Sequence, residues 1–251
     1  MKNIYRLDGN LALVTGASKG IGAAVAKALA RQGCDLMLLA RDVKGLEAVA
    51  AEIAAMGRKA RVFTVDLSNP SQIKKFVEAE RESLKKLDHY INNAAFTIHK
   101  TFMNTDLEEF DNLLSVNVKG AVSLTQEIAG HMRERRSGNI VIMTSVNALS
   151  PLPSQAMYSS TKAMLEALMK CAASELAPYG VRVNSIIPGA ILTDMNDHLS
   201  EEKLVGLAEK IPSRRIGAPE EVADVAAFLC SHGARYMYGS SVVVDGGILL
   251  R

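Results

Sequence analysis

The fold of this protein of 251 residues is decided by the stretch Leu11-Ala12-Leu13-Val14-Thr15-Gly16-Ala17-Ser18-Lys19-Gly20-Ile21-Gly22. Its first five residues form an apolar run that is too short for a helix and is followed at once by glycine, which predicts a buried parallel strand. The glycines then open an alanine-rich segment that predicts a helix to about residue 32. A strand, a glycine turn and a helix N-terminus together form an anion site, because glycines let the backbone approach a pyrophosphate and free amide groups favour it.

The spacing of the glycines narrows the choice of ligand. Gly16, Gly20 and Gly22 are separated by three residues and then by one, whereas the common dinucleotide fingerprint has one and then two. No lysine followed by Ser or Thr completes a phosphate-binding P-loop, so that class is excluded. The turn nevertheless lies between a strand and a helix, where dinucleotide binding requires it.

Strand and helix patterns alternate along the rest of the chain. We predict further strands at 34–40, 61–65, 89–92, 140–144, 181–187 and 242–244, and helices at 42–56, 106–133, 157–177 and 219–230. This alternation favours an α/β fold with a doubly wound parallel sheet. The length suits a single domain over residues 1–251, and the polar, helix-prone segment at about 190–217 is interpreted as a mobile lid over the substrate.

Composition excludes several classes of protein. The formal net charge is only +2 and the charges are dispersed, so we expect no nucleic-acid partner. No apolar run approaches the roughly 18 residues of a membrane span, and the first ten residues lack the apolar core of a signal peptide. The three isolated cysteines argue against a disulfide framework and fit a cytoplasmic protein. The five histidines lack the spacing of metal ligands, so no metal site is expected.

The end of the second predicted strand contains the residues expected to select the cofactor. At this position an acidic side chain binds the ribose hydroxyl of NAD, whereas an arginine accommodates the phosphate of NADP. The sequence has both, as Arg41 and Asp42, but Asp42 is also a good helix N-cap. We give Arg41 more weight, with Lys19 as a second cation for the same phosphate, and expect NADP(H) rather than NAD(H).

A tyrosine and a lysine four residues apart form a candidate acid/base pair. Tyr158 and Lys162 share one face of the helix predicted at 157–177, and a neighbouring ammonium group lowers the pKa of a phenol. Ser145 lies thirteen residues earlier, at the carboxyl end of a predicted strand, the edge at which open α/β sheets bind ligands. By themselves Tyr158 and Lys162 also fit an ordinary helix start.

Two more polar positions are candidates for the same site. Asn117 lies inside the helix predicted at 106–133, where an asparagine is mildly unfavourable, and it marks either a packing position or a kink that frees a carbonyl for water. Asp66 ends the third predicted strand and either contacts adenine or simply terminates the strand.

The glycine turn, Asn117, Ser145, Tyr158 and Lys162, in this order and on these elements, resemble the short-chain dehydrogenase/reductase family over essentially the whole chain. The resemblance implies a Rossmann-type fold with a seven-stranded sheet, and a homotetramer built on the two long helices. It also implies that Tyr158 protonates a carbonyl oxygen while NADPH delivers hydride, that Ser145 hydrogen-bonds this oxygen, that Lys162 holds the nicotinamide ribose and that Asn117 positions a water.

Residue by residue, the resemblance extends to the cofactor and the substrate. The residues assigned to the cofactor are Gly16, Ser18, Lys19, Gly20, Ile21, Gly22, Arg41, Asp66, Leu67, Asn93, Tyr158, Lys162, Ile191 and Thr193. The residues assigned to the substrate are Ser145, Phe96, Asn147 and Leu152, with Leu149, Met195 and His198 as further candidates. One departure is Ala95, where the family usually has glycine.

The substrate is left open between classes. The lid resembles that of 3-oxoacyl-carrier-protein reductases, for which Arg136 is a candidate contact with an acidic carrier protein. A second basic position expected near Gly180 is Tyr179 here, which counts against that interpretation. Sugar, polyol and steroid dehydrogenases share the same residues, and a non-catalytic nucleotide-binding protein is a further alternative from another class.

Overall fold

The glycine-linked strand β1 (Leu11–Thr15) lies in the middle of a parallel sheet in the computed structural model, which describes residues 4–193 and 200–250. The order of the seven strands is β3-β2-β1-β4-β5-β6-β7, and every neighbouring pair is parallel. The other strands are β2 (Asp35–Ala40), β3 (Ala60–Thr64), β4 (His89–Asn92), β5 (Gly138–Met143), β6 (Val181–Pro188) and β7 (Ser241–Val244). The predicted doubly wound sheet is confirmed.

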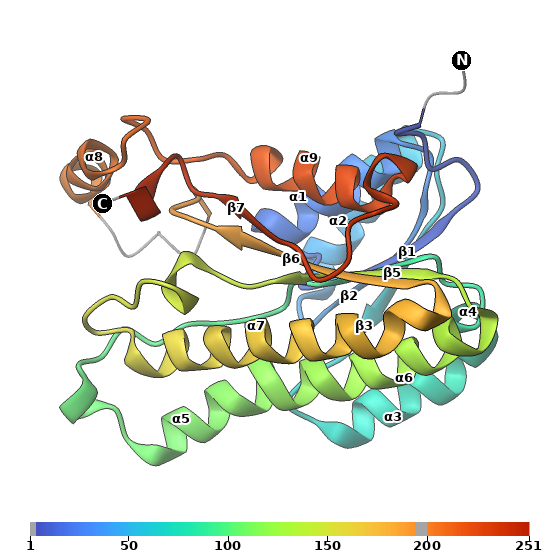
Figure 1. Cartoon of the computed structure of the whole chain (residues 1–251), viewed down its shortest axis with the longest axis horizontal. Helices are drawn as coiled ribbons and strands as arrows, with labels where there is room; N and C mark the ends of the chain where they lie inside the picture. Colours follow the sequence, from blue (N-terminus) through green and yellow to red (C-terminus); the bar gives the residue numbers. More distant parts are fainter. Residues whose placement is uncertain (1–3, 194–199, 251) are drawn as a thin grey trace.

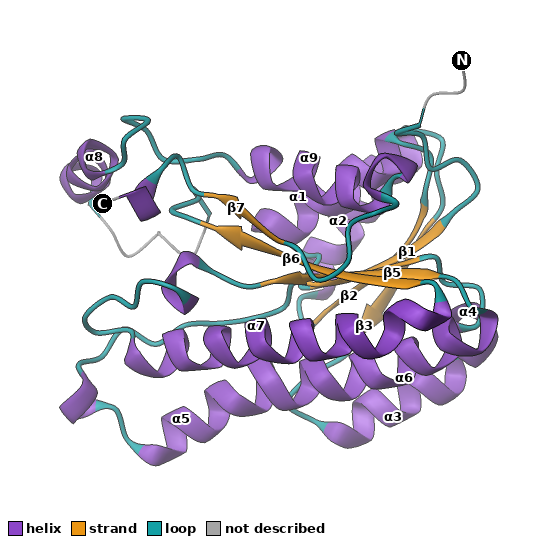
Figure 2. Ribbon diagram, in the orientation of Figure 1, coloured by secondary structure: helices purple, strands orange, loops and turns teal. Residues whose placement is uncertain are grey.

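Helices cover both faces of the sheet (Figures 1 and 2). One layer contains α1 (Gly20–Arg31), α2 (Val43–Ala55) and α9 (Pro219–Cys230). The other contains α3 (Pro70–Ala79), α4 (Arg81–Leu84), α5 (Leu107–Leu114), α6 (Ala121–Arg135) and α7 (Ala156–Leu176). A buried apolar cluster lies on each side of the sheet, which explains why the central strands are apolar on both faces. Helix α8 (Glu201–Lys210) stands apart, at the left of Figure 1.

The single helix predicted at 106–133 is wrong in one respect, because a π-helical segment, Ser115–Gly120, separates α5 from α6. A close backbone approach accounts for the glycine that ends this segment. A Cβ atom at position 120 would lie 2.0 Å from the carbonyl oxygen of Leu67, so only glycine fits where this segment crosses the start of the α3 loop. The extra residue per turn is of the kind that marks functional sites.

All three cysteines are free, with Cys34 and Cys230 buried and Cys171 exposed. None of the helices in the described ranges is long and apolar enough to cross a bilayer. Of the predicted lid at 190–217, the structure describes α8 and its flanks, and its mobility stays a prediction.

Candidate active site

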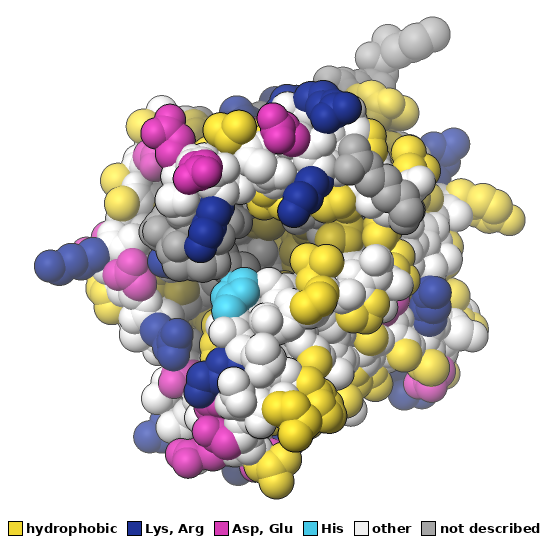
Figure 3. Space-filling model, turned by 90° about the vertical axis from the view of Figure 1, so that its left-hand side faces the viewer, with side chains coloured by type: hydrophobic (Ala, Val, Ile, Leu, Met, Phe, Trp, Pro, Cys, Tyr) yellow, Lys and Arg dark blue, Asp and Glu magenta, His cyan; other side chains and the backbone are white. Residues whose placement is uncertain are grey.

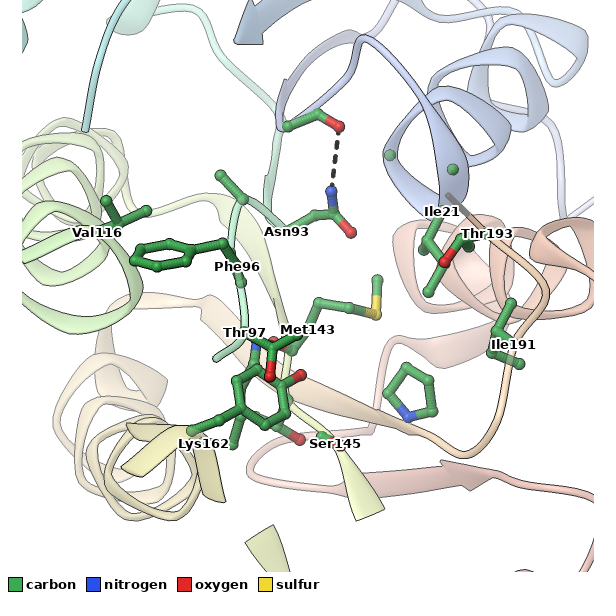
Figure 4. Close-up of a pocket in the computed structure, with 18 of the residues that line it drawn as sticks. Ile21, Asn93, Phe96, Thr97, Val116, Met143, Ser145, Lys162, Ile191 and Thr193 are labelled. Atoms are coloured by element: carbon green, nitrogen blue, oxygen red, sulfur yellow. Dashed lines mark hydrogen bonds between the residues drawn. The ribbon is translucent and has the colours of Figure 1, made fainter. Parts of the chain in front are cut away.

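The carboxyl ends of the strands surround a cavity of about 780 Å³, which extends from the glycine turn after β1 to the start of α7. Figure 3 looks into this end of the molecule, where a hollow opens between apolar and charged side chains. In Figure 4, Phe96, Thr97, Ser145 and Lys162 lie on one side of the cavity, and Ile21, Ile191 and Thr193 on the other. This is the crevice in which open α/β sheets bind their ligands.

The glycine turn is fixed by Asn93. The Asn93 amide donates hydrogen bonds to the carbonyl oxygens of Thr15, at 2.9 Å, and Gly16, at 3.3 Å, and Figure 4 marks one hydrogen bond of this amide with a dashed line. A Cβ at Gly22 would lie 2.1 Å from the Gly16 oxygen, so glycine is needed for this packing. The turn therefore presents the N-terminus of the 12-residue helix α1 to the cavity, which suits a pyrophosphate. Asn93 was predicted to contact the cofactor, and it also holds the turn itself.

The far end of the cavity contains residues predicted to bind the phosphates and the adenosine of the cofactor. Ser18, Lys19, Arg41, Asp66 and Leu67 all line it. Asp42 is the N-cap of α2 and accepts a hydrogen bond from the Gly45 amide at 3.2 Å, as the sequence indicated. The Asp66 carboxylate accepts from the amide and hydroxyl of Ser68, at 2.9 and 2.8 Å, and so shapes the loop after β3.

Ser145, Tyr158 and Lys162 converge on the opposite end. Ser145 follows β5, while Tyr158 and Lys162 lie one turn apart on α7, with the ammonium 5.7 Å from the phenol ring centroid. Tyr158 and Lys162 are 9% and 3% exposed. The Lys162 ammonium donates to the Met143 carbonyl oxygen at 2.9 Å, so the lysine is anchored to the strand that delivers Ser145.

The predicted lowering of the Tyr158 pKa is not what the structure gives. Burial raises the pKa of Tyr158 to about 12, and a hydrogen bond with Ser145 opposes this only in part. Burial also lowers the pKa of Lys162 to about 8. The sequence indicated the proximity of the two groups correctly but not the burial of both, which shifts both pKa values toward the neutral forms.

Asn117 lies behind the cavity wall, in the π-helical segment, and is fully buried. Its amide accepts from the Phe96 N–H at 3.0 Å and donates to the Phe96 carbonyl at 2.9 Å and to the Thr161 hydroxyl at 3.2 Å. Thr161 in turn donates to the Tyr158 carbonyl at 2.7 Å. Of the two alternatives for Asn117, a packing position and a kink, the structure shows both a packing role, because the side chain braces Phe96 and α7, and an irregular, π-helical backbone; its contact with a water stays a prediction.

The substrate end differs in part from the prediction. Phe96, Asn147 and Leu152 line the cavity as expected, whereas Leu149 is 53% exposed and does not line it. Met195 and His198 fall outside the described residues. Several residues that the sequence did not indicate also line the cavity, namely Thr97, His99, Val116, Gln155, Leu207 and Ile248. Only Gln155 had a sequence signal, since it precedes Tyr158 by one helical turn.

A glycine turn that accepts a pyrophosphate and a Ser-Tyr-Lys set in one cavity define a nucleotide-dependent dehydrogenase or reductase. A family model described as enoyl-(acyl carrier protein) reductase matches residues 16–249. The 3-oxoacyl-[acyl-carrier-protein] reductase FabG of Aquifex aeolicus is 39% identical over 244 residues, which are 97% of this chain and 98% of that protein.

Solved structures that resemble this protein belong to the same class of dehydrogenases and reductases. A short-chain type dehydrogenase/reductase from Mycobacterium marinum has 34% identity and a TM-score of 0.92, over 99% of this chain and 98% of that one. A candidate NAD(P)-dependent gluconate 5-dehydrogenase from Beutenbergia cavernae, with bound NADP, has 31% identity and a TM-score of 0.95, over 99% and 100%. The chain belongs to the short-chain dehydrogenase/reductase family and is an oxidoreductase of alcohol and ketone groups that uses a nicotinamide cofactor.

Proposed function

We propose that this protein is an NADPH-dependent ketoreductase, with a 3-oxoacyl thioester as the first candidate substrate. The observation that carries the proposal is the convergence of Ser145, Tyr158 and Lys162 at one end of a cavity whose other end is the glycine turn. A non-catalytic nucleotide-binding protein has no chemical need for this convergence.

Each of the three side chains has a distinct role. Tyr158, whose pKa is raised to about 12, is protonated at neutral pH and donates its proton to the carbonyl oxygen of the substrate. Ser145 donates a hydrogen bond to the same oxygen. Lys162 binds the nicotinamide ribose, and its positive charge stabilises the negative charge that develops on the Tyr158 phenol. When bound, the nicotinamide supplies the hydride.

The choice of NADPH rests on Arg41. Arg41 lines the cavity at the end of β2 and is exposed, whereas the Asp42 carboxylate is engaged in capping α2. We expect Arg41→Asp to lower the ratio of kcat/KM for NADPH over NADH at least about tenfold, equivalent to about 1.4 kcal/mol. Steady-state kinetics with both cofactors measure this ratio, and Lys74→Asp on α3 is the matched charge control. An unchanged ratio in Arg41→Asp overturns the cofactor assignment.

The similar proteins suggest two substrate classes, 3-oxoacyl thioesters and gluconate-type sugar acids, and the charged residues that line the cavity favour the first. Of the described residues that line the cavity, the lysines and arginines are Lys19, Arg41 and Lys162, and the first two lie at the adenosine end. Near Phe96 and Ser145 the one lysine or arginine among these lining residues is Lys162, which is buried and donates to the Met143 carbonyl, and none of the others is placed to pair with a sugar carboxylate. This favours a neutral ketone or thioester over a gluconate-type substrate.

The direct test is NADPH oxidation, followed by absorbance, with acetoacetyl thioesters, keto-sugars, sugar acids and a steroid ketone. We expect turnover of the thioester at a kcat/KM at least about tenfold above that of the sugar acids, because a carboxylate enters the apolar end unpaired. A preference for a sugar acid makes the gluconate-type alternative correct.

An acidic carrier protein is the partner proposed for the thioester. Tyr179 replaces the basic residue expected there, yet its ring lies 4.5 and 5.7 Å from the guanidinium carbons of Arg133 and Arg136. Its hydroxyl accepts from Arg133 at 3.1 Å, and Arg136 donates to the Pro178 carbonyl at 2.9 Å. Tyr179 thus holds two exposed cations in place, which keeps the surface positive.

The proposal includes a cytoplasmic homotetramer, the assembly typical of the family. Met164 and Leu168 expose 42% and 39% of their surface on the outer side of α7, where a neighbouring subunit is expected to cover them. The segment at 190–217 is proposed to close over the substrate, and Leu207 of α8 already lines the cavity.

A further inference from the structure

Gln155 occupies an unusual place at the substrate end of the cavity. It is the N-cap residue of α7, but its side chain makes no capping hydrogen bond. Ser, Thr, Asp or Asn would stabilise the helix here by about 1 kcal/mol, so glutamine is a poor choice for the helix alone. Its side chain lines the cavity instead, one helical turn before Tyr158.

The loop before Gln155 contains a costly backbone conformation, at Ser154. Ser154 has φ of 62°, in the left-handed region that non-glycine residues rarely adopt. Pro151 and Pro153 flank Leu152 in the same turn, and the Gln155 N–H donates to the Leu152 carbonyl at 3.2 Å. Such strain persists where the surrounding structure fixes it, and it concentrates at ligand-binding sites.

Two other segments brace the Gln155 amide. Its oxygen accepts a hydrogen bond from the Asn147 side-chain amide, and its nitrogen lies 3.1 Å from Nδ1 of His99. Flipping the Asn147 and Gln155 amides and exchanging the His99 tautomer swaps the donor and the acceptor in both hydrogen bonds. In either direction the Gln155 nitrogen has a second N–H that this chain of bonds does not use.

The braced amide is close to the reacting groups. Asn147 donates its main-chain N–H to the Ser145 hydroxyl at 3.2 Å, so one residue joins Gln155 to the group that contacts the substrate oxygen. The other walls of this end are largely apolar, with Phe96, Val116, Leu152 and Ile248. A polar donor that is fixed on an apolar wall orients a ligand and selects it.

We infer that Gln155 determines substrate specificity, by donating its second N–H to an oxygen of the substrate other than the reacting carbonyl. The inference rests on the proposed ketoreductase function and narrows it to ketones that carry a further acceptor oxygen near the reacting carbon, such as 1,3-dicarbonyl compounds. Asn147 and His99 are positioning residues that set the direction of the amide.

The test compares two ketones that differ only at the second oxygen. Ethyl acetoacetate and 4-ethoxybutan-2-one have the same chain, but the second has a methylene in place of the ester carbonyl. The measured quantity is the ratio of their kcat/KM values with NADPH. We expect Gln155→Leu to lower this ratio 10- to 100-fold, because a site that lacks its donor no longer distinguishes the two compounds.

Two further variants separate recognition from structural effects. Gln155→Glu keeps the size but loses both N–H groups, so it lowers the ratio as Gln155→Leu does and serves where the leucine variant fails to fold. Leu152→Ala, in the same turn, changes both kcat/KM values by a similar factor. An equal loss with both ketones in Gln155→Leu and Gln155→Glu overturns the inference and leaves the proposed function standing. No turnover of either ketone by the unmodified protein overturns both.

Discussion

The two ends of the central sheet both contain buried polar residues, but only those at one end face a cavity that a ligand can enter. At the carboxyl end, Ser145, Tyr158 and Lys162 face the 780 Å³ cavity. At the amino end, His89 of β4 and Asn139 of β5 are paired in register, as are Asn139 and Arg182 of β6. These three form a buried row across the sheet, and none of them lines that cavity.

The amino-end row makes its hydrogen bonds within the protein, although Nδ1 of His89 and Oδ1 of Asn139 are buried without a partner. The Asn10 amide lies 2.8 Å from Nε2 of His89, Asn139 donates to the Cys230 sulfur at 3.5 Å, and Arg182 donates to the Ala234 carbonyl at 3.1 Å. Burial, with a smaller effect of Arg182 and Arg135, lowers the pKa of His89 to about 3. Desolvation shifts pKa values at both ends, so a shifted pKa identifies a reactive group only where a ligand can reach it.

The largest effect that separates the two ends is expected from Tyr158→Phe. Loss of the general acid should lower kcat by about 10³-fold, within the usual range of such catalysis, with little change in stability. NADPH oxidation with the best ketone and a thermal melt measure the two effects. Tyr236→Phe, at a side chain that is 95% exposed, is the control. Unchanged turnover in Tyr158→Phe refutes the mechanism.

A smaller kinetic effect is expected from Lys162→Ala. Removal of the ammonium should lower kcat/KM by about 10²-fold and also weaken NADPH binding, because Lys162 serves both the phenol and the ribose. Since its pKa is lowered to about 8, its charge is lost as pH rises through 8, and wild-type affinity for NADPH should fall there. Fluorescence titration at pH 7 and pH 9 checks this, with Lys170→Ala on the exposed side of α7 as control. Equal NADPH affinity in wild type and Lys162→Ala contradicts the second role.

The smallest effect concerns the amino end and appears in stability alone. The folded pKa of His89, about 3, lies below its unfolded value of about 6.5, so the unfolded state binds the extra proton between these values. Stability is therefore full above about pH 6.5 and is lost as pH falls toward 3. Between pH 7 and 5.5 the loss from His89 is about 1.3 kcal/mol, and His89→Gln should remove this part of the pH dependence.

Urea unfolding at both pH values measures that difference. His232→Gln, at an exposed histidine, should retain the wild-type pH dependence. If His89→Gln changes kcat as strongly as Tyr158→Phe does, the distinction between the two ends fails.

The five inner strands could be predicted from the sequence because they are buried on both faces and appear as short apolar runs, whereas the edge strands β3 and β7 are partly exposed. The predicted boundaries are less exact than the positions, and the predicted span 140–144 is displaced by one or two residues from β5. The sequence indicated the π-helical segment only as one of two explanations for Asn117, and the close approach of Gly120 to the Leu67 carbonyl, fifty-three positions away in the chain, could not be predicted from it.

The candidate site shows the same limit. The shared face of Tyr158 and Lys162 is a local property of one helix, and the sequence predicted it correctly. The raised pKa of Tyr158 depends on burial by other segments, which the spacing does not contain. The orientation of Gln155 likewise depends on Asn147 and on His99, which is 56 positions away.

The hydrogen bonds of Asn117 have a consequence for re-engineering this enzyme. Asn117 grips the main chain of Phe96 and leaves its side chain unrestrained by any of these bonds. The ring can therefore be exchanged for smaller or larger groups while the frame that carries it, and through Thr161 the helix of Tyr158, keeps its shape. Position 96 is a point at which new substrates can be admitted without rebuilding the catalytic apparatus.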